Sequence, residues 1–411
     1  MHINHLSLTN FRNYGRLELS LPQGPVLLYG NNAQGKTNLL EAIYYLATTR
    51  SPHADNDAQL LNWNAAQSEE PVVVGRLVAS VATAQQTHQL EMRLIQEQKA
   101  SPSRTRNFSF RREALLDRRK VRLMDLLGAM RVVLFLPEDI QLLTGSPANR
   151  RRYMDITLCQ IDPVYCRTLS NYNKVLEQRN AVLRQIAEEQ TGRDMLPIYT
   201  EKLVSLGSDI FLRRAAFIAN ISRETQRIHY EALTEGRESI RLIYHPRFYL
   251  KKSKIAAKDK LRPAELSEWL ETDPGQSEIV TERFATLLQE SLATDIARGA
   301  TTVGPHRDDW SFQLNGRSLG SFGSRGQQRT AILALKMGEI NWMTTQTGER
   351  PILLLDEVVA ELDEQRRSAL LSSVTDTTQA ILTATDPGMF TDTFLQQATR
   401  MEVENGRVNV M

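Results

Sequence analysis

The residues with the most specific chemistry form one stretch near the start of the chain. Its pattern is Gly, four residues, Gly, Lys and Thr, which is the pattern of a phosphate-binding loop. The glycines let the backbone curl so that successive N–H groups surround phosphate oxygens, while the lysine reaches the outer phosphates and the threonine hydroxyl offers a ligand to Mg²⁺. We therefore expect a nucleotide to bind Gly30, Asn31, Asn32, Ala33, Gln34, Gly35, Lys36 and Thr37.

A second group of chemical residues lies in the C-terminal third. The apolar run at residues 351–355 ends in Asp356 and Glu357, which is the arrangement that metal-assisted attack of water on a phosphate requires. We expect Asp356 to hold Mg²⁺ together with Thr37, and Glu357 to orient or deprotonate the attacking water. The structural alternative is a pair of acids that cap the next helix.

A helix start in the same third of the chain predicts another anion site. Ser324, Gly326 and Gln327 open an apolar-periodic helix. The first N–H groups of a helix have no partner within the helix and point outward, so they can bind an anion. One chain therefore has two phosphate-binding ends.

Three further places are weaker candidates. Arg12 and Asn13 precede the phosphate loop and could lean toward the nucleotide, although a solvated turn arginine is the competing interpretation. Glu138 and Asp139 follow a buried strand at residues 132–136 and suggest a loop that faces metal or water. His306 is expected to be a structural histidine whose neighbours satisfy its ring.

Two basic segments are candidate DNA surfaces. Residues 104–122 hold eight Lys or Arg and residues 247–262 hold seven, with aromatic side chains among them. Such segments suit contacts to a phosphate backbone and to stacked bases, but a charged run is also typical of a solvated face. The DNA-binding candidates are Arg104, Arg106, Arg111, Arg112, Lys251, Lys252 and Lys254.

The elements that must position these residues are visible in the periodicity. Residues 26–29 read as a buried strand before the phosphate loop, and residues 38–47 as the helix after it. Strands with period-2 alternation surround this unit, whereas residues 156–300 show helical periodicity. Because the phosphate loop and the Asp356 strand lie on opposite sides of that helical stretch, the domain that contains them is split in sequence.

Composition sets the broad class. The chain has 411 residues, of which 41% are hydrophobic, so it can form a large core and two domains. Neither an apolar run that would cross a bilayer nor a signal peptide is evident, so we expect a cytoplasmic protein without a membrane partner. Two cysteines are too few to predict a disulfide framework or a zinc site, and the net charge of +2 says little about an anionic partner.

The motifs occur in the order found in ABC-type ATPases, and within these the chain resembles the RecF family of bacterial recombination mediators, short relatives of the structural-maintenance-of-chromosomes proteins. Beside the ATPase motifs, the resemblance rests on blocks spread over nearly the whole chain: residues 10–14, 137–139, 145–147, 150–152, 304–309 and 326–329. These blocks are more specific to the family than a phosphate loop alone.

The resemblance implies an α/β fold: an ABC-type P-loop ATPase domain with flanking antiparallel strands, plus an inserted, mainly helical domain. The implied domains are residues 1–155 and 300–411 for the two parts of the ATPase and 156–299 for the insertion. ATP and Mg²⁺ are the implied cofactors. Two subunits would enclose two ATP molecules, with Ser324 and Gly326 of one reaching the γ-phosphate held by Lys36 of the other, and Asp363 bridging the joint.

The implied function is ATP-dependent DNA binding in repair of gaps and forks. The homodimer would form with ATP on single- or double-stranded DNA, regardless of base sequence, and weak, DNA-stimulated hydrolysis would act as a release switch. RecR, with RecO, is the implied partner in loading a recombinase. The chain departs from the general ABC pattern twice, since Glu138 and Asp139 stand where a glutamine is usual, and Thr385 and Asp386 where a histidine is usual.

Three other interpretations remain open at this stage. An ABC subunit of a membrane transporter shares the ATPase motifs but not the long helical insertion. A phosphotransferase with a small substrate would have no need of the helix at Ser324. The third is a DNA-binding module whose nucleotide site is only structural. Loss of Glu357 would then leave the release of DNA unchanged.

Overall fold

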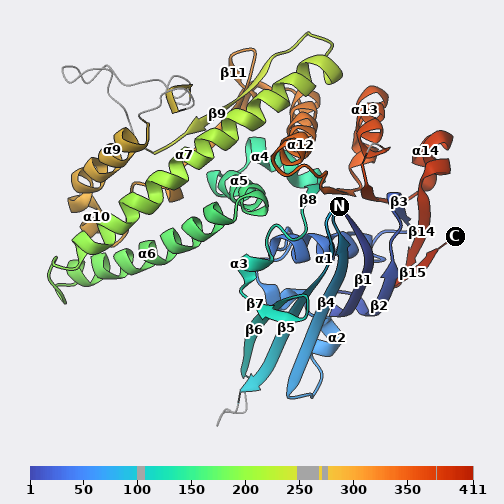
Figure 1. The fold of residues 1–411 in the computed structure, drawn as a ribbon, viewed down its shortest axis with the longest axis horizontal. Coiled ribbons are helices and arrows are strands. Elements are labelled where there is room, and N and C mark those ends of the chain that lie inside the picture. Colours follow the sequence, from blue (N-terminus) through green and yellow to red (C-terminus); the bar gives the residue numbers. More distant parts are fainter. Residues whose placement is uncertain (100–106, 248–267, 271–275, 376, 411) are drawn as a thin grey trace. The chain divides into compact units, whose positions relative to one another are not determined.

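The computed structural model describes residues 1–99, 107–247, 268–270, 276–375 and 377–410 (Figure 1). They form two compact units, of which the first comprises Met1–Asp139 with Glu339–Met411 and the second Ile140–Gly338. This division follows packing alone. The sequence predicts two domains by role, an ATPase domain in two parts and a helical insertion, and that division stays a prediction.

The first unit contains an antiparallel sheet in the order β2-β1-β4-β5-β6-β7. Leu17 and Leu19 are buried while Glu18 and Ser20 are exposed, the alternation that is usual for a sheet with one face on a core. The strands that the sequence predicts around the phosphate-loop unit are confirmed. The strands are β1 (His2–Phe11), β2 (Tyr14–Ser20), β4 (Val72–Ala82), β5 (Thr87–Lys99), β6 (Asn107–Leu116) and β7 (Arg119–Val121).

The same unit contains a second sheet in the order β15-β14-β3-β13-β12-β8, in which all the paired strands run parallel except β14 and β15. Four neighbouring parallel strands are mostly apolar and buried, as expected of parallel strands covered on both faces. They are β3 (Gly24–Tyr29), β13 (Gln379–Ala384), β12 (Ile352–Asp356) and β8 (Val132–Phe135), with β14 (Thr399–Glu404) and β15 (Arg407–Val410) at one edge.

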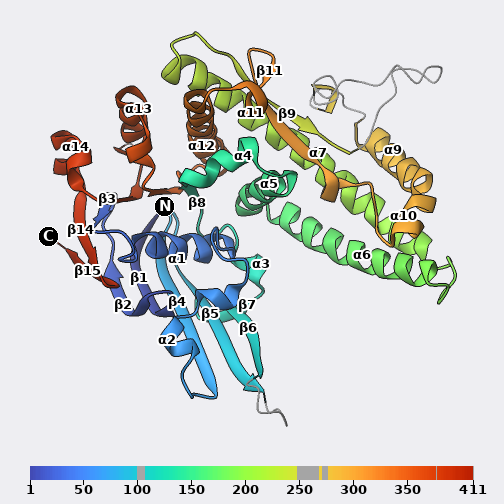
Figure 2. The same ribbon diagram turned by 180° about the vertical axis from the view of Figure 1, so that it is seen from behind.

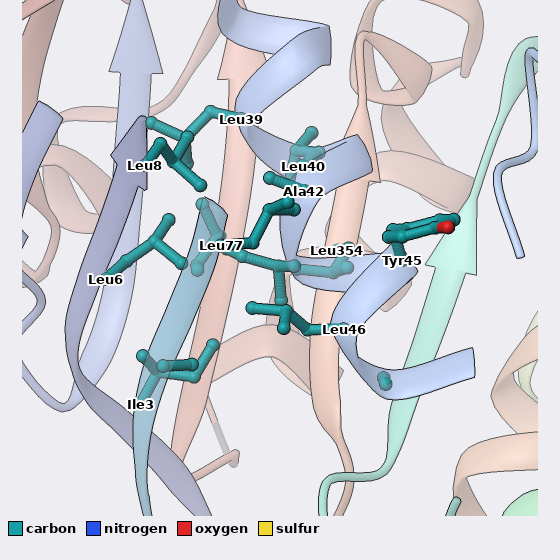
Figure 3. Close-up of a cluster of buried hydrophobic side chains, with 14 of the residues drawn as sticks. Ile3, Leu6, Leu8, Leu39, Leu40, Ala42, Tyr45, Leu46, Leu77 and Leu354 are labelled. Carbon is teal, nitrogen blue, oxygen red and sulfur yellow. The ribbon is translucent and has the colours of Figure 1, made fainter. Parts of the chain in front are cut away.

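Helix α1 (Lys36–Thr48) lies between these two sheets. Figure 3 shows its side chains Leu39, Leu40 and Leu46 among those of Leu8 from β1 and Leu354 from β12. A helix that is apolar on most of its surface must be buried on several sides, and this one forms the centre of the core. Among the described residues, the other α-helices of this unit are α2 (Trp63–Ala66), α3 (Leu123–Leu126), α13 (Glu364–Thr375), α14 (Asp392–Gln397) and the part of α12 (Arg325–Thr347) from Glu339 onward.

The second unit is mainly helical, as the periodicity predicted. Two long helices, α6 (Pro163–Ala187) and α7 (Leu196–Ile228), run side by side (Figures 1 and 2). They are accompanied by α4 (Gln141–Thr144), α5 (Pro147–Ile161), α9 (Gln276–Glu290), α10 (Leu292–Arg298), α11 (Leu319–Phe322) and the start of α12 (Arg325–Thr347).

A small antiparallel sheet completes this unit. Its order is β11-β10-β9, formed by β9 (Ile240–His245), β10 (Asp309–Leu314) and β11 (Arg317–Ser318). The turn at Asn315 and Gly316 has positive φ at both residues, which matches the right-handed twist of a hairpin. This residue pair therefore closes the hairpin between β10 and β11.

Candidate nucleotide-binding site

The phosphate loop joins β3 to α1 and is shaped by its glycines. Gly30 has φ 143° and a Cβ there would lie 2.4 Å from the carbonyl oxygen of Val403, so any other residue is excluded by sterics. Gly35 has φ 116° and forms the N-cap of α1. Because a glycine cap has no side chain, the first N–H groups of the helix are left for an anion.

Neighbouring side chains hold the loop in this form. Asn13 donates to the carbonyl of Gln34 at 2.9 Å and accepts from Asn38 at 2.8 Å, and Tyr14 donates its hydroxyl to the carbonyl of Gly35 at 3.0 Å. The backbone N–H of Asn405 donates to Gln34 at 2.7 Å. Asn13 thus supports the loop, and its predicted contact with the nucleotide stays a prediction.

A cleft of about 350 Å³ opens beside the loop. The carboxyl ends of β3, β12 and β8 converge there. Ligands of open parallel sheets bind where such strand ends meet, so this cleft has the usual place of a ligand site. Residues from all three strand ends line it: Asn32, Ala33, Gly35, Lys36, Thr37, Asn38, Glu138, Asp356 and Glu357, together with His53.

Lys36 is buried in the loop and close to an acid. Its ammonium donates to the carbonyls of Gly30 at 2.7 Å and Asn31 at 2.9 Å, and lies 3.5 Å from Oε1 of Glu357. An ammonium has three donors, so these two bonds leave one for a phosphate oxygen. The half-exposed Glu357 carboxylate faces both this cation and water.

Asp356 and Thr37 meet although 319 residues separate them. Oδ1 of Asp356 accepts from the hydroxyls of Thr37 at 3.0 Å and Thr383 at 2.7 Å. Burial raises the pKa of Asp356, and the two hydroxyl hydrogen bonds act in the opposite direction. Hydroxyl and carboxylate oxygens are the ligands that Mg²⁺ prefers, and it retains waters as well, so these two residues fit a magnesium ion.

Glu138 lines the cleft, whereas Asp139 is not among the lining residues. The carboxylate of Asp139 accepts from the backbone N–H of Leu136 at 2.8 Å and so closes the local turn. Asp386 likewise caps a turn by accepting from Gly388 at 2.8 Å. Of these acids, Glu138 has the position for a metal or water contact, and that role stays a prediction.

The Arg12 side chain is fixed by an ion pair with Glu41, a buried acid of α1. Its guanidinium forms two hydrogen bonds with Glu41, at 2.7 and 2.8 Å, and a third with the carbonyl of Gln59 at 3.1 Å. Ser51 donates to the same carboxylate at 2.5 Å. The geometry gives Arg12 a supporting role for α1, and its predicted contact with nucleotide remains a prediction.

Ser324, Gly326 and Gln327, the helix start that is predicted to bind an anion, are called the signature below. Ser324 and Gln327 form a capping box at the start of α12. Ser324 Oγ accepts from the N–H of Gln327 at 3.2 Å, and the Gln327 side chain accepts from the N–H of Ser324 at 2.9 Å. Ser324 and Gly326 are exposed, and the nearby Phe322 has an exposed fraction of 78%. The second predicted phosphate-binding end is therefore a solvent-facing helix start.

Asp363 occupies the N-terminal end of α13. Its carboxylate accepts from the backbone N–H of Arg366 at 3.0 Å and pairs with the Arg366 guanidinium. The carboxylate thus caps the helix in the single chain. Its predicted place at a joint between subunits is not tested by these contacts.

The candidate DNA residues divide into two groups. Arg104, Arg106, Lys251, Lys252 and Lys254 lie outside the described residues. Arg111 pairs with Glu97 at 3.0 Å and with Glu113, and Arg112 pairs with Asp57 at 2.7 Å while donating to the carbonyl of Thr49 at 3.1 Å. Both described arginines are thus engaged by the fold, which favours the solvated-face alternative for this strand.

Two contributors were missed from the sequence. His53 lines the cleft, and Ser51 accepts from its N–H at 3.0 Å, while Glu41 organises the base of α1. The short distance in sequence between His53 and the end of α1 could have indicated that His53 lies near the cleft. The residues between them do not show in which direction the chain turns after α1. His306 is a structural histidine as expected, with Tyr172 at 2.8 Å and the carbonyl of Thr301 at 3.0 Å on its two ring nitrogens.

Within the described ranges, no cluster of three or more His, Cys, Asp or Glu side chains could hold a metal by themselves. Among the helices of that same part, none is both long and apolar enough for a membrane span.

Comparisons with known proteins cover the whole chain. The family model for the RecF/RecN/SMC N terminal domain matches residues 2–409. The DNA replication and repair protein RecF of Chloroflexus aurantiacus is 39% identical over 413 residues, with 99% of each chain covered. A solved structure of the recombination mediator protein RecF-ATP in the RecFOR pathway has a TM-score of 0.81 at 28% identity, covering 100% of this chain and 97% of that one.

Proposed function

Since the chain belongs to the RecF family, within the RecF/RecN/SMC group of ABC-type ATPase folds, we propose that it is an ATP-dependent DNA-binding protein of recombinational repair and replication. Two copies would close around two ATP molecules on DNA and separate after slow hydrolysis. The main support is the cleft in which Lys36, Thr37, Asp356 and Glu357 converge.

The residues of the cleft have distinct tasks in this proposal. The N–H groups at the start of α1 and the Lys36 ammonium bind the β- and γ-phosphates, and Thr37 with Asp356 holds Mg²⁺. A magnesium ion held there would supply positive charge to the phosphate oxygens. Glu357, which is half exposed, orients the attacking water and accepts its proton.

The exposed signature supplies the reason for two copies. Ser324 and Gly326 present a helix start to solvent, and the cleft of the same protein belongs to the other unit. A γ-phosphate bound by Lys36 of one copy and by Ser324 of a second would join the copies, and its loss would release them. The exposed Phe322 would be covered in such a dimer.

The partners follow from the relatives. Solved RecF structures are described as belonging to the RecFOR pathway, so we propose RecR, with RecO, as partners and single- or double-stranded DNA as the ligand. Full-length similarity to RecF proteins favours this function over a transporter subunit or a small-substrate phosphotransferase.

The test is DNA binding with and without ATP and Mg²⁺, at two salt concentrations, for the wild type and Lys36→Met. Loss of a charge-assisted hydrogen bond should weaken ATP binding by roughly tenfold or more and remove the ATP-dependent gain in DNA affinity. Higher salt should weaken binding by the wild type. A wild type that stays monomeric with saturating ATP and binds DNA equally without it would contradict the proposal.

A further inference from the structure

A carboxylate outside the nucleotide motifs contacts the signature. Oε1 of Glu238 accepts from Nε2 of Gln327 at 2.7 Å, and Oε1 of Gln327 accepts from the N–H of Ser324 at 2.9 Å. The three residues form one chain of hydrogen bonds, although 89 positions separate Glu238 from Gln327. All of them lie in the second unit.

This contact decides which way the Gln327 amide faces. An amide has an acceptor oxygen and a donor NH₂ at opposite sides, and Glu238 as a carboxylate only accepts. With the NH₂ bound to Glu238, the oxygen is directed to the N–H of Ser324. If the carboxylate were absent, the amide would be free to rotate and to place its NH₂ against that N–H.

The capping box then fixes the position of the Ser324 hydroxyl. Ser324 Oγ accepts from the N–H of Gln327 at 3.2 Å, so its own O–H remains a donor for another group. The hydroxyl therefore has a fixed position and a free proton. That is the state in which a serine at a helix start can bind a phosphate.

The backbone around Glu238 is itself well anchored. Thr234 donates to the carbonyl of His229 at 2.7 Å, and Ser239 donates its N–H to the Asn315 side chain at 2.9 Å. His229 is buried at the start of a π-helical turn, His229–Leu233, that follows α7, and its Nε2 lies 3.9 Å from Oε2 of Glu238. Glu238 thus joins the end of the longest helix to the signature.

We propose that Glu238 is a positioning residue for the signature, which holds Gln327 and Ser324 in the geometry that binds the γ-phosphate of a second copy. This inference rests on the proposed function, since the phosphate is that of the ATP-bound dimer. Glu238 itself contacts neither the cleft nor nucleotide in this scheme. Its effect is exerted through Gln327.

The test compares Glu238→Ala and Glu238→Gln with Glu231→Ala, a control carboxylate on the π-helical turn whose side chain is 65% exposed. Two quantities are measured on each full-length protein: ATP affinity at concentrations where the chain is monomeric, and the ATP-dependent dimerisation constant by analytical ultracentrifugation. Hydrogen exchange of the peptide spanning Ser324 to Gln327 is measured in the monomer.

We expect Glu238→Ala to weaken dimerisation roughly tenfold, the loss of one hydrogen bond to a charged group, while ATP affinity of the monomer is unchanged. Exchange at the signature should become faster. Glu238→Gln should show smaller changes in dimerisation and in exchange than Glu238→Ala, because its amide oxygen can accept from Gln327. Glu231→Ala should match the wild type in both measurements.

The inference would be overturned if Glu238→Ala had the same hydrogen exchange at the signature as the wild type, or the same dimerisation constant. It would also be overturned if the ATP affinity of the monomer fell as much as dimerisation did. Faster exchange in a protein whose wild type never dimerises with ATP would support the role of Glu238 in holding the signature and would contradict the proposed dimer. The two proposals can therefore fail separately.

Discussion

Two adjacent acids at the end of β12 have opposite environments. Asp356 is buried and accepts from two hydroxyls, whereas Glu357 is half exposed and faces Lys36. Glu357 also has positive φ, at 52°, and its N–H donates to Thr383 at 2.9 Å, so the backbone turns sharply between the two side chains. This turn directs one acid to the hydroxyls that suit a cation and the other to water.

Glu357→Gln should separate ATP binding from hydrolysis. The amide cannot accept a proton, so hydrolysis should slow by roughly 100-fold or more, while Asp356 and Thr37 still support ATP binding. If hydrolysis is the release step, the dimer should remain on DNA for longer. Single-turnover hydrolysis and DNA dissociation are measured in parallel, and unchanged DNA release despite lost hydrolysis would refute the switch.

His306 should make the second unit sensitive to acid. Burial lowers the pKa of His306 from 6.5 to about 4, so the unfolded chain takes up a proton at a pH where the folded chain does not. Stability from the neutral ring is present above pH 6.5 and is lost as the pH falls toward 4. From pH 7 to pH 5 the wild type should lose about 2 kcal/mol more unfolding free energy than His306→Gln.

Urea unfolding at pH 7, 6 and 5 measures this difference. Replacing Gly192, which lies away from the His306 hydrogen bonds, by alanine provides a control whose pH dependence should equal that of the wild type. An identical pH dependence for the wild type and His306→Gln would show that the buried ring does not control acid stability.

At the scale of elements, α1 depends on a buried ion pair as well as on apolar packing. The Glu41 side chain has an exposed fraction of 1% and binds Arg12 from the turn between β1 and β2. Ser51, from the loop that leads to His53, donates to the same acid at 2.5 Å. One carboxylate therefore links the helix that bears Lys36 to two loops near the cleft.

Glu41→Ala should destabilise the first unit by about 3 kcal/mol, because it leaves the Arg12 guanidinium without its partner in a largely buried position. Glu41→Gln should cost less, since the amide oxygen can still accept one bond. Thermal unfolding and ATP affinity are measured together, with Glu18→Ala as an exposed control expected to cost less than about 1 kcal/mol. Equal effects at positions 41 and 18 would refute the role of the buried pair.

At the scale of the whole molecule, the question is which basic segment binds DNA. The strand candidates Arg111 and Arg112 are engaged by Glu97, Glu113 and Asp57, so their charges are already balanced. A balanced charge releases few counterions when it meets a phosphate. We therefore favour the segment around Lys251, Lys252 and Lys254, whose charges stand almost unopposed in the sequence.

The triple variant Lys251→Ala, Lys252→Ala and Lys254→Ala should weaken DNA binding and reduce the slope of log affinity against log salt by roughly 2 to 3. Arg111→Ala should change the slope little. Fluorescence anisotropy with single- and double-stranded oligonucleotides at several salt concentrations gives both values. A larger effect from Arg111→Ala would reverse the assignment of the surfaces.

The sequence by itself was sufficient for features that depend on neighbouring residues. The phosphate loop, the strand that ends in Asp356 and Glu357, the Asn315–Gly316 hairpin and the helix start at Ser324 are each specified by contiguous residues, because backbone conformation and capping are local. The parallel strands were likewise evident as short apolar runs.

Only the tertiary structure decided which of these features meet. Strand β13 lies between β3 and β12, so the Thr383 hydroxyl at its end joins the Asp356 carboxylate that also accepts from Thr37. Strand order, the path of the loop to His53 and the reach of Glu238 to Gln327 arise from packing between segments far apart in the chain. No local pattern encodes such pairings, because their energy exists only once the sheets and helices have assembled.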